Sequence, residues 1–186
     1  MAKRSSALES NYHQIHNTNE DKNSLVLREI KDLQLIQIAA WPETIEKVGK
    51  DIARYLNLPT YPLANKALTH QDSIIMRVEP LKWWLIGSQT PLLSTQDGTT
   101  LDLSHSYTRI EISGNNSQLF LNRFLPLDLR DNFFPSGSVA SSTIHHVSIK
   151  LLRLEKSFQI FIPRGFALSL WETFLETAKQ FNFEVK

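Results

Sequence analysis

The chain of 186 residues contains no cysteine, and this absence excludes several classes of site at once. Without thiols the protein cannot form disulfides, hold zinc or iron–sulfur clusters through thiolates, or use a thiol nucleophile. Glycine is also scarce, and the six glycines are never closer than 11 positions along the chain. Phosphate-binding loops need glycines about two to five positions apart, so that backbone amides can approach the anion. The sequence therefore predicts neither a dinucleotide-binding fingerprint nor a P-loop.

The chain also lacks an excess of charge and a long apolar run. Its 20 Lys and Arg residues balance 19 Asp and Glu residues, for a net charge of +1, which predicts no basic surface for nucleic acid or an acidic membrane. The longest uncharged stretch, Asn132 to Ile149, contains five serines and two histidines and cannot cross a bilayer core. The N-terminus lacks the apolar segment of a secretory signal. We expect a cytoplasmic protein with neither a nucleic acid nor a membrane as partner.

The residues that are present favour a folded protein of modest size. Apolar residues make up 41% of the chain and aromatic residues 10%, which is too high a share for an intrinsically disordered sequence. A chain of this length buries roughly 70% of the surface that its unfolded form exposes. The length fits one domain or two small fused domains.

The first part of the chain predicts a tail followed by a small α+β unit. Residues 1–26 are polar and predict a disordered tail. Leu33–Ala40 indicates a short apolar strand, which Trp41-Pro42 ends. Pro42 suits a first helical turn, and apolar residues then recur at helical spacing, at Ile45, Val48, Ile52, Tyr55 and Leu56.

A hairpin is predicted next. Two short strands, Ile74–Val78 and Trp83–Ile86, flank Glu79-Pro80-Leu81-Lys82, where proline fixes φ at the second position of a turn. Residues 89–100 contain Pro91 and the dipeptide Asp97-Gly98, and they indicate a long connection rich in turns.

The second half is more regular. Polar Tyr107, Arg109 and Glu111 alternate with apolar or small residues, which is typical of a half-buried strand. The second half of the chain predicts six elements in the order strand, helix, strand, strand, helix, strand. The four strands are expected at Tyr107–Ser113, Val139–Leu154, Phe158–Ile162 and Phe183–Val185, and the two helices at Asn115–Leu125 and Phe166–Phe181. This order is the β-α-β-β-α-β plan of ferredoxin-like folds.

The fold class predicted for the whole chain is therefore α+β, built from two small fused units. The turn-rich connection is the best internal boundary, so the first unit is expected at residues 27–95. The second, ferredoxin-like unit is expected at residues 96–186.

Two clusters invite a catalytic or metal-binding interpretation, and geometry argues against both. Asp102, Ser104 and His105 resemble a triad in composition, but neighbours on an extended segment point to opposite faces, and a relay needs groups that converge from different parts of the fold. A strand-to-turn junction held by local hydrogen bonds is the simpler interpretation. His145 and His146 fall in a predicted strand, where adjacent side chains cannot reach one ion.

Aromatic side chains give the best hint of a partner. Trp83 and Trp84 are adjacent on a predicted strand, so they point to opposite faces. Either one of them is exposed or both faces of the strand are covered. Phe133-Phe134 lies in a loop bounded by prolines. Since exposed aromatic residues commonly anchor partners, these four residues are the candidate subunit interface.

Six segments, taken in order, resemble the gamma subunit of heterotetrameric sarcosine oxidase. The resemblance runs from about Leu27 to Phe181, and it rests on the order and spacing of the segments. They are WPET (Trp41 to Thr44), KWWL (Lys82 to Leu85), DLSHSYTRIEISG (Asp102 to Gly114), LPLDLRDNFFPSG (Leu125 to Gly137), the strand around Thr143 to Val147 and IPRGFALSLWETF (Ile162 to Phe174). Gly165 stands where members of this family commonly have serine.

The resemblance implies a fold similar to the folate-binding domains of aminomethyltransferases, including the T-protein of glycine cleavage. It also implies a noncatalytic subunit in a complex that oxidatively demethylates sarcosine to glycine and transfers the one-carbon unit to tetrahydrofolate. The implied partners are the alpha, beta and delta subunits, which would hold FAD, FMN, NAD, zinc and tetrahydrofolate. No catalytic residue, cofactor site or metal site is carried over to this chain.

Two other functions stay open at this point. One is a stand-alone folate-dependent aminomethyltransferase, for which Asp102 is the candidate carboxylate. The other is an accessory domain in RNA modification, against which the balanced charge argues.

Overall fold

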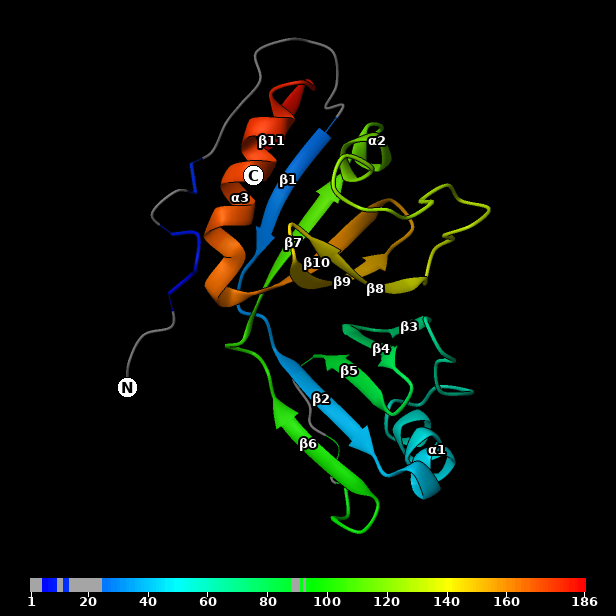
Figure 1. Cartoon of the computed structure of the whole chain (residues 1–186). Coiled ribbons are helices and arrows are strands. Elements are labelled where there is room, and N and C mark those ends of the chain that lie inside the picture. Colours follow the sequence, from blue (N-terminus) through cyan, green and yellow to red (C-terminus); the bar gives the residue numbers. More distant parts are fainter. Residues whose placement is uncertain (1–4, 10–11, 14–24, 88–90, 92) are drawn as a thin grey trace. The chain divides into compact units, whose positions relative to one another are not determined.

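The computed structural model describes residues 5–9, 12–13, 25–87, 91 and 93–186. Figure 1 shows their helices and strands. The chain forms two compact units. Unit 1 is drawn from residues 1–31, 106–136 and 141–186, and unit 2 from residues 32–105 and 137–140. Unit 2 therefore consists of two segments, a long one and a short one, that interrupt the sequence of unit 1.

Unit 1 is a six-stranded sheet with helices, in the strand order β11-β1-β7-β10-β9-β8. Its elements are β1 (Leu25–Ile30), β7 (Tyr107–Ser113), α2 (Ser117–Leu121), β8 (Val139–Ile144), β9 (Val147–Arg153), β10 (Ser157–Pro163), the 3-10 turn η2 (Arg164–Phe166), α3 (Ala167–Ala178) and β11 (Phe183–Val185). Strand β7 is antiparallel to both β1 and β10, and β1 runs parallel to β11. From β7 onward the observed order is β-α-β-β-β-α-β, which has one strand more than the predicted β-α-β-β-α-β plan, and β1 is added between β11 and β7.

The core of unit 1 comes from alternate positions of the central strands and from α3. Ile110, Ile112, Phe158 and Ile160 are fully buried. Helix α3 has a buried side, and its Phe174 ring lies 5.8 Å from the ring of Phe120 in α2. Figure 1 shows α3 running alongside the sheet. The predicted apolar stripe of the last helix is thus confirmed as part of this core.

Unit 2 is a five-stranded sheet with one helix packed against it. Its elements are β2 (Leu35–Ala40), the 3-10 turn η1 (Pro42–Thr44), α1 (Ile45–Tyr55), β3 (Ala67–His70), β4 (Ser73–Glu79), β5 (Lys82–Ile86) and β6 (Gly98–Asp102), and the strand order is β3-β4-β5-β2-β6. Val48 and Ile52 of α1 share one buried cluster with Ile38, Trp83 and Leu85 of the sheet. The predicted helix and the predicted β4–β5 hairpin are both confirmed.

The boundary predicted between residues 95 and 96 is wrong. Strand β6 lies beyond that boundary, yet it pairs with β2 from Ile36↔Asp102 to Ala40↔Gly98 and so belongs to unit 2. Strand β1 lies before the boundary and belongs to unit 1. The physical reason is that strand pairing joins segments far apart in sequence, whereas turn residues report only local conformation. The predicted turn-rich connection overlaps residues 88–90 and 92, which lie outside the described residues.

Part of the predicted disordered tail contacts unit 1. Leu8 is fully buried, and the ring of Tyr12 stacks on Trp171 with 5.4 Å between centroids. The Ser6 hydroxyl donates to both carboxylate oxygens of Glu29, at 2.5 and 2.7 Å. The Tyr12 hydroxyl accepts from the Glu29 backbone N–H at 3.0 Å, and burial raises its pKa. Residues 5–9 and 12–13 are therefore part of the folded unit, and the prediction was wrong for them.

The pairing of β6 with β2 allows no side chain at Gly98. A Cβ atom built there would lie 2.1 Å from the carbonyl oxygen of Ala39, which is backbone and cannot move aside. We expect Gly98→Ala to destabilise the protein by about 2 kcal/mol or more, in the range of overpacked sites. A Cβ at Gly165 meets no atom within 4 Å, so Gly165→Ala is the matched control, expected within about 0.5 kcal/mol of wild type. Urea unfolding measures both, and equal midpoints for the two variants would contradict the β2–β6 register.

Candidate functional site

The residues that resemble a triad form a turn at the end of β6. The Asp102 carboxylate accepts from the Ser104 backbone N–H at 2.8 Å. The Ser104 hydroxyl accepts from the Leu35 N–H at 3.0 Å and donates to the Leu35 carbonyl at 3.5 Å. His105 is exposed. Asp102 and Ser104 thus bind backbone groups at the junction of β6 and β2, as the simpler interpretation predicts.

His145 and His146 lie in a turn, and their assignment to a continuous strand was wrong. The predicted strand at residues 139–154 is two strands, β8 and β9, joined by this pair. Both residues have positive φ, 46° and 70°, which matches the two-residue turn of type I′ that suits the twist of a hairpin. Among the residues that the structure describes, no group of three or more potential metal-ligating side chains comes together.

The two tryptophans of the candidate interface are core residues. Trp83 is fully buried in the cluster under α1. Trp84 is 2% exposed, and its indole N–H donates to the Gln37 side-chain oxygen at 3.3 Å. Both faces of β5 are therefore covered, which was the second of the two alternatives. In this conformation neither tryptophan is available to a partner.

The two phenylalanines differ from each other, because Phe134 is buried whereas Phe133 is 66% exposed. The guanidinium carbon of Arg130 lies 4.9 Å from the centre of the Phe133 ring. Arg130 in turn pairs with Asp128 at 2.5 Å, and this hydrogen-bonded contact lowers the pKa of the Asp128 carboxyl. The Phe133 backbone N–H also donates to the Arg130 carbonyl at 2.9 Å. The exposed ring thus lies against a guanidinium from its own loop.

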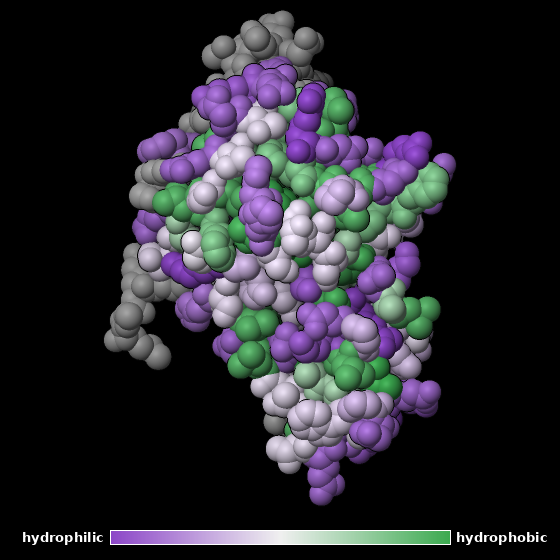
Figure 2. All heavy atoms as spheres, viewed as in Figure 1, coloured by the Kyte–Doolittle hydropathy of each residue, from purple (hydrophilic) through white to green (hydrophobic). Residues whose placement is uncertain are grey.

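Other large apolar residues at the surface lie on several elements. They include Trp41, Leu63, Leu101, Leu119 and Phe166. On the face that Figure 2 shows, apolar side chains form separate small groups among polar ones. Among these exposed residues, Phe133 lies against a guanidinium that also pairs with a carboxylate.

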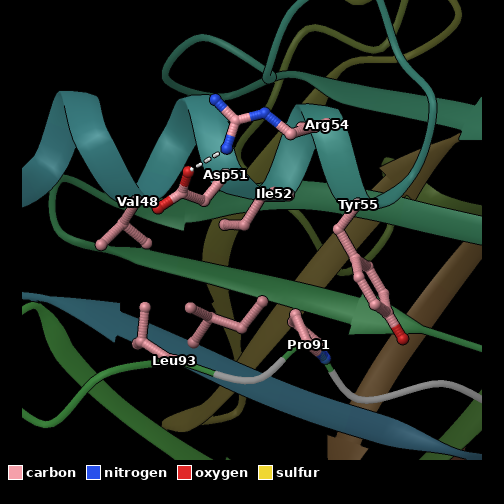
Figure 3. A pocket seen from close by; sticks show the side chains of 8 residues that line it. Val48, Asp51, Ile52, Arg54, Tyr55, Pro91 and Leu93 are labelled. Atoms are coloured by element: carbon pink, nitrogen blue, oxygen red, sulfur yellow. Dashed lines mark hydrogen bonds and ion pairs between the residues drawn. The ribbon is translucent and has the colours of Figure 1, made fainter.

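A pocket of about 580 Å³ opens in unit 2 beside α1 (Figure 3). Its base is apolar and is formed by Ile38 of β2, Val48 and Ile52 of α1, and Leu93. Tyr55 reaches toward Pro91, and the Asp51–Arg54 ion pair, at 2.9 Å, lies at the helix side of the opening. A volume of this size accommodates a small organic molecule. The sequence did not predict this pocket. Tyr55 was assigned to the apolar stripe of the helix, whereas in the structure it is exposed at the rim of the pocket.

Comparison with known proteins gives matches in structure. No protein-family model matches the sequence, and no curated protein matches it either. A chain of heterotetrameric sarcosine oxidase from Corynebacterium sp. U-96, in complex with pyrrole 2-carboxylate, shares the fold with a TM-score of 0.80. The two chains are 17% identical, and the match covers 96% of each. The fold relationship that the resemblance implies is therefore confirmed.

The second match is an aminomethyltransferase. The aminomethyltransferase T of the glycine cleavage system from Bartonella henselae has a TM-score of 0.57 and 14% identity. The match covers 88% of this chain and 48% of the transferase, so the chain spans about half the length of that protein. The predicted likeness to folate-binding aminomethyltransferase folds is confirmed at the level of fold. None of the helices in the described parts of the chain is long and apolar enough to cross a membrane.

The turn geometry at the histidine pair predicts the outcome of a double substitution. Left-handed backbone conformation costs an L-residue about 1–2 kcal/mol, and Asn-Gly is the preferred pair for a type I′ turn. We expect His145→Asn combined with His146→Gly to raise the free energy of unfolding by up to about 1 kcal/mol, measured by urea unfolding. His145→Ala with His146→Ala is the matched control and should not stabilise the protein. A structural requirement for the imidazoles would appear as destabilisation of both double variants.

Proposed function

We propose that this chain is a noncatalytic subunit of a sarcosine-oxidase-like complex, with a role in assembly like that of the gamma subunit. One observation carries the proposal: the match to a chain of heterotetrameric sarcosine oxidase covers 96% of both chains. The correspondence with the aminomethyltransferase is weaker and takes in about half of that protein. The ordered similarity of the six sequence segments supports the gamma subunit as the counterpart of this chain.

In this proposal, the partner subunits supply the chemistry. The complex would oxidatively demethylate sarcosine to glycine in the cytoplasm and transfer the one-carbon unit to tetrahydrofolate. The alpha, beta and delta subunits would hold FAD, FMN, NAD, zinc and tetrahydrofolate. This chain would contribute a folded surface that the other subunits bind.

Phe133 is the contact that we assign to this surface. It is exposed, aromatic and held by Arg130, so little side-chain freedom is lost when a partner covers it. Residues that carry most of the energy of an interface are commonly aromatic side chains or arginines that insert into a pocket of the partner. Phe134 is buried in the same loop, whereas Trp83 and Trp84 belong to the core of unit 2 and are not assigned to this surface.

Co-expression of this chain with the flavin and folate subunits of the complex tests the proposal. A subunit of the complex should co-purify with them in a fixed stoichiometry through size-exclusion chromatography. A chain that elutes as a monomer beside its own partners would rule the proposal out.

Phe133→Ala tests the assigned contact. We expect this substitution to weaken assembly by about 1–4 kcal/mol while leaving the unfolding midpoint of the isolated chain unchanged. Leu63→Ala is the matched control, because Leu63 is similarly exposed, at 68%, and lies in unit 2. If both variants assemble like wild type, Phe133 does not lie in the interface.

The fold shared with the aminomethyltransferase favours a second candidate function, that of a stand-alone folate-dependent enzyme. Its candidate carboxylate, Asp102, accepts a hydrogen bond from the backbone of its own turn. Titration of the isolated chain with tetrahydrofolate separates the two functions. Saturable binding at submillimolar ligand, lost in Asp102→Asn, would favour the enzyme over the subunit.

A further inference from the structure

A groove in unit 1 lies between the hairpin turn that joins β8 to β9 and the start of α3. Its volume is about 340 Å³. The described residues that line it are His145 and Val147 from the hairpin, and Phe166, Ser169, Leu170 and Thr173 from η2 and α3. All six belong to unit 1, so one compact unit forms the groove by itself.

Two of the segments that resemble the gamma subunit meet at this groove. His145 and Val147 fall in the segment from Thr143 to Val147. The other four lining residues fall in the segment from Ile162 to Phe174. The two segments therefore share a feature of the surface as well as a place in the order of the sequence.

The groove is open to solvent. Phe166 is 53% exposed, and His145 and Ser169 are exposed as well. Of the described residues that line the groove, Leu170 alone is buried. A Cβ atom at Gly165, the residue before Phe166, would meet no atom within 4 Å, so no other described segment covers that side of the turn. A molecule in the groove would therefore stay partly in contact with water.

The lining offers aromatic surface and hydrogen-bonding groups. Its described residues include no aspartate, glutamate, lysine or arginine. The Phe166 ring and Leu170 provide apolar contact, and the His145 imidazole and the Ser169 hydroxyl can form hydrogen bonds. The Thr173 hydroxyl donates to the Ser169 carbonyl at 2.9 Å and can still accept a hydrogen bond. Such a lining suits an uncharged aromatic ring that carries a hydrogen-bonding group.

The turn that carries His145 has an unfavourable backbone conformation. The φ angle is 46° at His145 and 70° at His146, in the left-handed region that L-residues adopt uncommonly. Residues held in such conformations are concentrated at binding sites. Here the turn brings His145 to the groove beside the start of α3. The position of this imidazole thus supports a binding role.

We propose that this groove receives a tyrosine or tryptophan side chain of a partner subunit. The ring would cover Phe166, and its hydroxyl or indole N–H would bind to His145 or Ser169. Small-molecule pockets bury most of their ligand, so an open groove of about 340 Å³ favours one side chain attached to a protein. Tyrosine and tryptophan are enriched in protein interfaces, whose centres are depleted of charged residues. The inference rests on the proposed function for the identity of the partner, a subunit of the sarcosine-oxidase-like complex.

Titration of the isolated full chain with capped amino acids tests the groove without the partner. The probes are N-acetyltryptophanamide and N-acetyltyrosinamide, which imitate residues within a protein chain. We expect saturable shifts of the His145 imidazole signals in NMR spectra, with dissociation constants in the millimolar range. Free tryptophan should bind no more tightly than its capped form. Tighter binding of free tryptophan, or no saturable shift with either capped probe, would overturn the proposal.

Phe166→Ala removes the aromatic wall of the groove. We expect this variant to bind the capped probes about three- to tenfold more weakly than wild type. Leu119→Ala is the matched control, because Leu119 is 51% exposed, lies in unit 1 and does not line the groove. This control should bind like wild type, and equal affinities for the two variants would contradict the assignment of the groove.

Ser169→Trp fills the groove from an exposed position and tests the contact in the complex. It should weaken assembly at least about tenfold and leave the unfolding midpoint of the isolated chain unchanged. Glu176→Trp adds a side chain of the same size at an exposed position of α3 outside the groove and should assemble like wild type.

The outcomes separate this inference from the proposed function. If wild type and Ser169→Trp co-purify equally well with the partner subunits, the groove is not the contact, whereas the proposed function stands. If wild type itself does not co-purify, the proposed function fails, and with it the assignment of the partner.

Discussion

The antiparallel pairing of β1 with β7 is the constraint on which the rest of the structure depends. It joins residues 26–30 to residues 109–113, so residues 32–105, the larger part of unit 2, are closed off as an insertion between two neighbouring strands. Closing a loop of this length costs entropy, which the pairing and the burial of Leu25 and Leu27 must offset. The two ends of the inserted segment are also joined directly, because the Leu103 N–H donates to the Leu35 carbonyl at 2.8 Å. The β1–β7 pairing therefore brings together distant segments of unit 1, and the Leu103–Leu35 hydrogen bond does the same in unit 2.

Elements that depend on local pattern could be predicted from the sequence. Helix α1 follows from Pro42 and the spacing of Ile45, Val48 and Ile52, and the β4–β5 hairpin follows from the turn at Pro80. Strand β1 was missed because Glu29 occupies a buried position in its alternation, where the Ser6 hydroxyl satisfies the carboxylate. That partner lies 23 residues away and belongs to the segment predicted as a tail. No window along the sequence reveals such a pairing.

The candidate site shows the same limit. Burial of both Trp83 and Trp84 requires cover on two faces of β5, and the sequence could only leave the two alternatives open. The isolated exposure of Phe133 depends on a loop that turns Phe134 inward. Positive φ at His145 and His146 has no signal in the sequence, because the residues beside the pair, Ile144 and Val147, favour strands and histidine is a rare choice for a type I′ turn. The sequence therefore predicted one continuous strand across residues 139–154, where the structure has two strands joined by a turn.

Arg109 was identified in sequence as one polar residue of an alternating strand, and its significance comes from the strand next to it. A glutamate at position 159 would neutralise the guanidinium within the protein, whereas the glutamine found there only orients it. An amide leaves the positive charge of Arg109 uncompensated in a partly desolvated place, where it destabilises the folded state relative to a paired charge. The register of β7 against β10 thus brings the Gln159 amide, and not a carboxylate, within hydrogen-bond reach of the Arg109 guanidinium.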